Sequence, residues 1–133
     1  MRDYVQNQTA ILLRRLNLQI NRALRDGNPE AVHDLRVAIR RLSRCLQVFS
    51  EFYPGQSWKR MRRRLSRLMD ACGAVRDLDI AIELVAKAGI ARNSVAVREL
   101  QSERAHAERE LMLELRRWKG TAAAREWKTE LGL

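Results

Sequence analysis

The stretch V-H-D-L-R-V-A-I-R-R-L-S-R-C-L-Q-V-F-S-E-F, residues 32–52, decides how this chain folds. Its large apolar residues recur at three- and four-residue steps, the spacing that puts side chains on one face of an α-helix. These residues are Leu35, Ile39, Leu42, Leu46 and Phe49. A second set on another face has the same spacing and consists of His33, Arg36, Arg40 and Arg44. The stretch therefore predicts a helix that buries one face in a core and directs several cations away from it.

The charge on that second face is unusually uniform. A solvated helix face normally mixes charges of both signs, whereas only Asp34 and Glu51 interrupt the positive charge here. Like charges held close together repel one another, so we expect a bound anion to offset them.

The rest of the chain predicts further amphipathic helices separated by short breaks. We expect helices over 3–25, from Pro29 to a break at residues 53–55, from Ser57 to about 88, over 92–118, and over 121–131. Asn28 is expected to cap the second helix, Gly27 to end the first in the left-handed conformation, and Gly73 to kink or break the third. Short loops between long helices predict an all-α fold, an antiparallel four-helix bundle over 3–118 with a short extra C-terminal helix, in a single domain of residues 1–133.

Composition points to a polyanionic partner. The chain has 133 residues, a net charge of +10 and a pI near 10.9. Residues 1–70 hold 15 Lys/Arg and 6 Asp/Glu, a net charge of +9, so the anion-facing surface is expected on the first half. No segment reaches the ~20 apolar residues that cross a bilayer, and the N-terminus lacks the apolar run of a secretion signal. We expect a cytoplasmic protein without membrane contact, with Cys45 and Cys72 as reduced thiols in or beside the core.

The third predicted helix carries a second basic row. Its members are Lys59, Arg60, Arg62, Arg63, Arg64 and Arg67. A hairpin about Pro54-Gly55 would bring this row beside the second helix, with Arg44 level with Arg67 and with Arg76 near His33. Arginine presents a planar fork that matches two phosphate oxygens, so a phosphate-rich anion is favoured over an acidic protein surface.

Several residues allow other interpretations. His33 could cap or hydrogen-bond in the first helical turn, contact phosphate, or bind a metal, although no ligand cluster accompanies it. Asp77 and Asp79 are expected to cap a helix after Gly73 and to orient Arg76, with a two-metal site as the alternative. The chain has no Gly-rich phosphate loop and no nucleophile–base pair, so we expect no enzyme, no cofactor and no metal.

Three functions follow from these patterns. The first is a non-catalytic binding module for a chain of phosphates. The second is nucleic-acid binding, for which only Trp58 lies near enough to stack on bases, and its spacing favours the core. The third and weakest is a metal-assisted phosphohydrolase built on His33, Asp77 and Asp79.

Two motifs, H33-D-L-R36-V-A-I-R40-R41-L-S-R44 and G73-A-V-R76-D77-L-D79-I, resemble the CHAD domain, the conserved histidine α-helical domain. The resemblance implies a helical bundle that binds inorganic polyphosphate and associates with polyphosphate granules. Matched to the motifs, the implied binding residues are His33, Arg36, Arg40, Arg41, Arg44 and Arg76. The hairpin geometry, not the motifs, adds Arg63 and Arg67.

The resemblance also implies a second four-helix unit, because such domains usually contain two. The motif H-x-x-R-V-x-x-R-R occurs once in this sequence. Either the chain is a fragment or two copies assemble, and we expect a homodimer that covers apolar helix surface.

Overall fold

The fold is built from helices alone. A computed structural model describes residues 1–120 and 123–133, and the side chains outside residues 120–125. The α-helices are α1 (Arg2–Arg25), α2 (Pro29–Val48), α3 (Ser57–Lys87), α4 (Val95–Gly120) and α5 (Ala123–Glu130), and a short 3-10 helix, η1 (Ser50–Phe52), follows α2. No β-strand occurs in these described ranges, so the predicted all-α class is confirmed.

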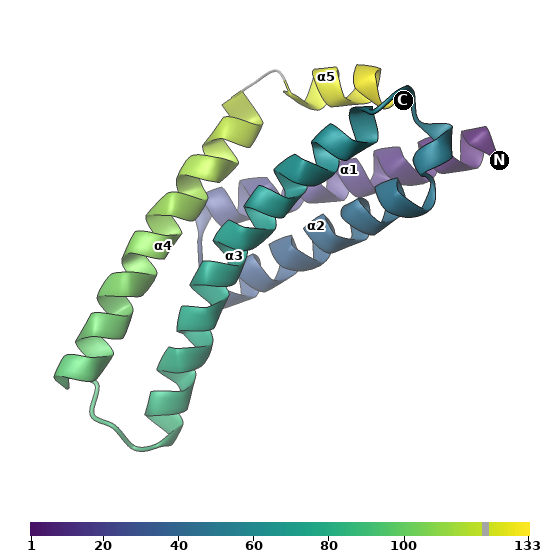
Figure 1. Cartoon of the computed structure of the whole chain (residues 1–133). Coiled ribbons are helices and arrows are strands. Elements are labelled where there is room, and N and C mark those ends of the chain that lie inside the picture. Colours follow the sequence, from purple (N-terminus) through teal and green to yellow (C-terminus); the bar gives the residue numbers. More distant parts are fainter. Residues whose placement is uncertain (121–122) are drawn as a thin grey trace.

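The four long helices form two antiparallel hairpins (Figure 1). The α1–α2 hairpin lies against the α3–α4 hairpin, with α2 beside α3 and α1 beside α4. Figure 1 also shows that the α3–α4 loop projects well past the turn between α1 and α2. Apolar side chains near this projecting end are exposed: Ile80, Leu84, Ile90 and Val95. The bundle core therefore ends before the α3–α4 hairpin does.

The core contains the apolar face predicted for α2. Leu35, Ile39, Leu42 and Leu46 are at most 1% exposed, and one continuous cluster of buried side chains draws on all five α-helices. Cys72 is also buried, and both cysteines are free thiols, as predicted. Burial raises the pKa of the Cys72 thiol to about 12, against the opposing charge of Arg36.

The turn between α1 and α2 confirms one predicted cap and corrects the other. The Asn28 side chain accepts a hydrogen bond from the Ala31 N–H at 2.8 Å, which caps α2 as expected. Gly27 is not left-handed, so that prediction is wrong: α1 ends with Asp26 in an extended conformation. Gly27 instead allows close packing, because a Cβ there would overlap the Glu108 carboxylate of α4.

Helix α3 runs unbroken through Gly73, so the expected break is wrong. Cys72 and Val75 are both fully buried, and this packing outweighs the cost of about 1 kcal/mol for glycine within a helix. Asp77 and Asp79 consequently lie inside a helix, where no free N–H groups remain for them to cap.

Asp79 makes its ion pair with α4, not with Arg76. Its Oδ1 accepts from Arg104 Nε at 2.9 Å, and Arg104 also donates to Glu108 at 2.6 Å and to the Gly27 carbonyl oxygen at 2.7 Å. One arginine thus joins α3, α4 and the α1–α2 turn where the two hairpins diverge.

The C-terminal segment follows the prediction closely. Helix α4 begins at Val95 and α5 covers Ala123–Glu130, against predicted ranges of 92–118 and 121–131, and residues 121 and 122 lie outside the described residues. Trp127 and Leu131 are buried, as expected of anchors. The Trp127 ring stacks on Trp118, with their centroids 6.1 Å apart, and the Arg64 guanidinium lies 5.4 Å and 5.6 Å from the two rings. None of the described helices has both the length and the apolar content to cross a membrane.

Candidate functional site: a basic surface on α2 and α3

One face of α2 lies directly against α3. Arg62 Nε of α3 donates to Ser43 Oγ of α2 at 3.3 Å, and Arg36 of α2 lies near enough to Cys72 of α3 to influence its pKa. Arg76 shares a face with Arg62, because steps of seven residues return to nearly the same direction on a helix. By this periodicity Arg76 belongs to the face of α3 that borders α2, and both motif arginines, Arg36 and Arg76, are half-buried.

Arg36 has a donor that the protein leaves unused. Its Nε–H is buried and donates to no acceptor among the described residues. A buried, unpaired donor costs free energy unless an acceptor reaches it. This favours an anion at the junction.

The outward face of α2 carries His33, Arg40 and Arg44, all exposed. None of these side chains makes a hydrogen bond or ion pair with another described residue. Because Asn28 caps α2, the capping interpretation of His33 is wrong. These three side chains are free to contact a ligand in solution.

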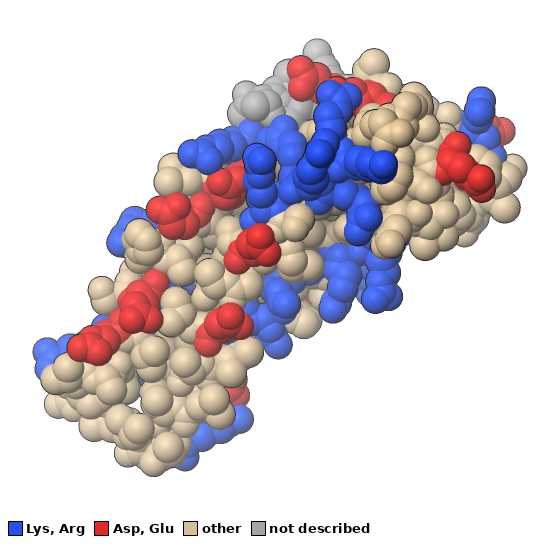
Figure 2. All heavy atoms as spheres, viewed as in Figure 1, with Lys and Arg blue, Asp and Glu red and all other residues tan. Residues whose placement is uncertain are grey.

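Several arginines of α2 and α3 have no carboxylate partner in the described chain, and we call six of them the α2–α3 basic surface. They are Arg36, Arg40, Arg44, Arg62, Arg63 and Arg76. Figure 2 shows Lys and Arg side chains gathered over the first half of α3 and continuing toward α2, while Asp and Glu lie mostly around them. An ion pair does form at one edge, where Arg60 lies 3.4 Å from Glu130 of the C-terminal segment.

Two predicted residues lie away from the α2–α3 junction. Arg41 lines a cleft between α2 and α1, because it is turned ~100° from Arg40. Arg67 lines a depression of about 430 Å³ between α3 and α5, together with Arg63 and Glu126. The Ser43–Arg62 hydrogen bond places Arg44 level with the segment around Met61, not with Arg67 as predicted. The basic residues therefore form a broad surface with side clefts and not the single groove expected.

An aromatic side chain borders the basic surface. Trp58 is half-buried, and the Lys59 ammonium lies 5.5 Å from the centre of its ring. Trp58 lines a depression of about 420 Å³ together with Arg62, Arg63 and Ser66. The prediction that Trp58 belongs to the core is thus only half right, since part of the ring faces the basic side chains.

The residues considered for a metal centre are not grouped as ligands. No set of three or more His, Cys, Asp or Glu side chains among the described residues is placed to hold a metal ion. Of the two carboxylates proposed for such a centre, Asp79 is already held by Arg104.

The sequence pattern did not single out two residues of these basic regions. Arg62 was one of a row of six cations, and its contact with Ser43 depends on the hairpin register. Arg15, which lines the cleft with Arg41, lay among charges off the apolar face of the first helix. A helical-wheel comparison of the first two helices could have indicated that they face each other.

The comparisons with known proteins agree with the resemblance in the two motifs. Searches among curated proteins and among solved structures found no match to this chain. The family model described as CHAD domain matches residues 8–132, nearly the whole sequence. The chain therefore belongs to the CHAD domain family.

Proposed function

We propose that this protein binds inorganic polyphosphate on the α2–α3 basic surface and does not act on it chemically. The observation that carries the proposal is the set of six neighbouring arginines with no carboxylate partner in the described chain. Membership of the CHAD family, which is linked to polyphosphate binding, supports the same ligand.

The two kinds of arginine would contribute differently. Arg40 and Arg44 are exposed, so their attraction to phosphate is screened by salt. Arg36 and Arg76 are half-buried, where a charge-assisted hydrogen bond to a phosphate oxygen is stronger. Polyphosphate repeats a negative charge at every unit, so one chain can contact both kinds at once. The predicted binding set also includes His33 on the outward face of α2, Arg63 of the α2–α3 basic surface, and Arg41 and Arg67 in the side clefts.

A competition experiment tests the ligand. Labelled polyphosphate is bound at fixed ionic strength and challenged with RNA, DNA or heparin of equal charge concentration. We expect unlabelled polyphosphate to displace the label at a concentration at least tenfold lower than the others, because arginine forks fit densely spaced phosphates. Equal displacement by all four polymers would reduce the interaction to nonspecific charge attraction.

A matched pair of variants tests the site. The triple variant Arg36→Gln, Arg40→Gln, Arg44→Gln should lose measurable polyphosphate binding while its helical circular dichroism is unchanged. The control Arg98→Gln, Arg109→Gln, Arg116→Gln removes the same charge from exposed positions on α4. If both triples weaken binding equally, the α2–α3 basic surface is not the site.

Nucleic-acid binding is the second candidate, and Trp58 is the observation that favours it. A partly exposed ring beside arginines is an arrangement on which a base can stack. Trp58→Leu would then weaken single-stranded RNA binding by about tenfold, since stacking contributes ~1–3 kcal/mol per base, but leave polyphosphate binding unchanged. An RNA affinity that exceeds the polyphosphate affinity and depends on Trp58 would make this the main function.

We further infer that two copies of the chain assemble through the projecting end of the α3–α4 hairpin. Leu84 is 61% exposed and Val95 is 65% exposed there, next to Ile80 and Ile90. Apolar side chains grouped in this way favour a covering partner, and a second copy would also restore the two-unit arrangement. Sedimentation should give a dimer that Leu84→Lys converts to a monomer, and a wild-type monomer at all concentrations would refute the inference.

Polyphosphate binding would bring the protein, which we expect in the cytoplasm, to polyphosphate granules, and this localisation stays a prediction.

A further inference from the structure

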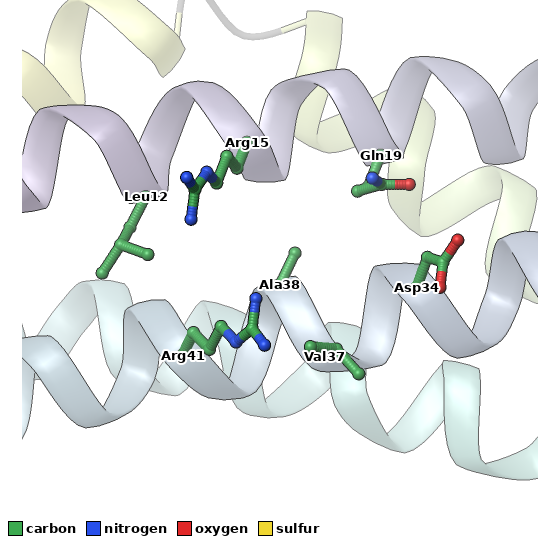
Figure 3. A pocket seen from close by; sticks show the side chains of 7 residues that line it. All are labelled: Leu12, Arg15, Gln19, Asp34, Val37, Ala38 and Arg41. Atoms are coloured by element: carbon green, nitrogen blue, oxygen red, sulfur yellow. The ribbon is translucent and has the colours of Figure 1, made fainter.

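A second basic site lies on the other side of α2. A cleft of about 270 Å³ lies on the surface between α1 and α2 (Figure 3). Its walls mix apolar and polar side chains from the two helices. They are Leu12, Arg15, Gln19, Asp34, Val37, Ala38 and Arg41.

Two cations point into this cleft from opposite walls. Figure 3 shows the Arg15 guanidinium reaching from α1 into the space between the two helices, and Arg41 lying along α2 with part of its guanidinium turned toward α1. Neither forms an ion pair with a described carboxylate. Asp34, the one acidic residue that lines the cleft, is already bound by Arg22. The two guanidinium groups therefore border the same cleft without a neutralising partner, an arrangement that suits an anion bound there.

One residue of the α1 wall, a helical turn beyond Arg15, has an unused acceptor. Gln19 lines the cleft, and the Oε1 atom of Gln19 is buried with no hydrogen-bond partner among the described residues. A carbonyl oxygen can only accept, so its ligand must bring an O–H or N–H. A fully deprotonated phosphate brings neither.

We propose that this cleft binds the terminal phosphate group of a polyphosphate chain, an inference that rests on the proposed function. A terminal phosphate has a second ionisable oxygen with a pKa of about 6, as in a phosphate monoester. Near that pH it presents charged oxygens to Arg15 and Arg41 and an O–H to Gln19. An interior unit of the chain has a single acidic oxygen, which is ionised, and no O–H, so the cleft selects chain ends.

The position of the cleft lets one chain reach both sites. The cleft lies between α2 and α1, whereas Arg36 and Ser43 face α3. Between the two sides runs the exposed face of α2, which carries Arg40 and Arg44. A chain whose end is held by Arg15 and Arg41 would cross these two arginines and continue onto the α2–α3 basic surface.

The test compares two ligands with three phosphorus atoms each. Linear tripolyphosphate has two terminal groups, whereas cyclic trimetaphosphate has none. Binding is measured by calorimetry at pH 6 and fixed ionic strength. Arg15→Gln should weaken tripolyphosphate binding roughly tenfold or more, the usual effect of losing a charge-assisted hydrogen bond, and should change trimetaphosphate binding less than twofold.

Two controls make the result specific. Arg14→Gln removes the same charge from the neighbouring exposed position, which does not line the cleft, and should affect both ligands alike and weakly. Gln19→Met removes the acceptor at similar size. Wild type should prefer the linear ligand less at pH 8 than at pH 6, and Gln19→Met should show no such change.

The outcomes separate this inference from the proposed function. If Arg15→Gln weakens tripolyphosphate no more than Arg14→Gln, the chain-end site is refuted while long-chain binding through Arg36, Arg40 and Arg44 stands. If wild type binds tripolyphosphate in an Arg15-dependent way but does not bind long chains, the cleft is supported as a phosphate site and the proposed function fails.

Discussion

The salt dependence of polyphosphate binding gives a quantitative test of the α2–α3 basic surface. Each cation–phosphate contact that displaces a counterion adds about 0.7 to the slope of log affinity against log salt for a single-stranded polyanion. Six arginines without carboxylate partners predict a slope near −4 for wild type. Raising the salt from 50 to 200 mM would then weaken binding about 300-fold.

Removing two of these contacts changes the slope by a calculable amount. Arg40→Gln combined with Arg44→Gln takes away two exposed cations that no described carboxylate neutralises. The slope should become shallower, about −3, so the same increase in salt would weaken binding only about 50-fold. Both positions are solvent-exposed on α2, so the free energy of unfolding should change by less than ~1 kcal/mol.

Fluorescence anisotropy of labelled polyphosphate at four or more salt concentrations measures the slope. The matched control is Arg109→Gln with Arg116→Gln, which removes the same charge from exposed positions on α4. The control lowers overall attraction but should keep a slope near that of wild type. Equal slopes for wild type and the Arg40, Arg44 variant would show that these two residues make no phosphate contact, and the reasoning from unpaired arginines would fail.

Three further predictions concern the fold that positions the site. Gly27→Ala should lower the free energy of unfolding by about 1–3 kcal/mol, because the added Cβ would displace the Glu108 carboxylate from Arg104. Gly73→Ala should raise it by ~0.5–1 kcal/mol, because a Cβ there meets nothing within 4 Å. Urea unfolding measures both. Arg104→Met should destabilise the protein by about 1–3 kcal/mol and speed hydrogen exchange around Gly27, because it leaves the Gly27 carbonyl oxygen and the Asp79 carboxylate unpaired. An unchanged urea midpoint would contradict this. The Cys72 thiol has a pKa of about 12 in the fold and near 9 when unfolded, so its contribution is intact below pH 9 and is lost as the pH rises toward 12, by at most ~1.4 kcal/mol per pH unit. Cys72→Ala should therefore show a shallower loss of stability than wild type over that range.

Periodicity predicted the helices well because each apolar face needs a core. The residues of the α2 apolar face occupy the centre of the protein, and Asn28 with Pro29 marks the start of that helix. The left-handed end expected at Gly27 and the break expected at Gly73 were wrong for a shared reason. Both relied on local conformational preference, while the outcome was decided by α4 packing on Gly27 and by the buried neighbours of Gly73. A single sequence does not specify such tertiary contacts.

The candidate site was predictable in type but not in shape. In the hairpin of the second and third helices, Arg36 lies beside Cys72 of α3, and Arg76 follows Cys72 by one helical turn. Arg41 lies on another side of α2 than its neighbour Arg40, because one residue step turns a side chain by ~100°, enough to move it to the α1 side. The partner helix on that side, and hence Arg15, depends on how the first two helices face each other.

The distribution of ion pairs links the fold to the proposed function. Arg22, Arg60 and Arg104 each have carboxylate partners, and these ion pairs join different helices: α1 to α2, α3 to α5, and α3 to α4. The arginines of the α2–α3 basic surface have none in the described chain and join nothing except through the Arg62–Ser43 hydrogen bond. Unpaired like charges weaken the compact state by mutual repulsion. A bound polyanion that neutralises them should therefore raise the free energy of unfolding. The charge lies on exposed faces beside a largely apolar core, so the core supplies the stability and the basic surface remains available for phosphate.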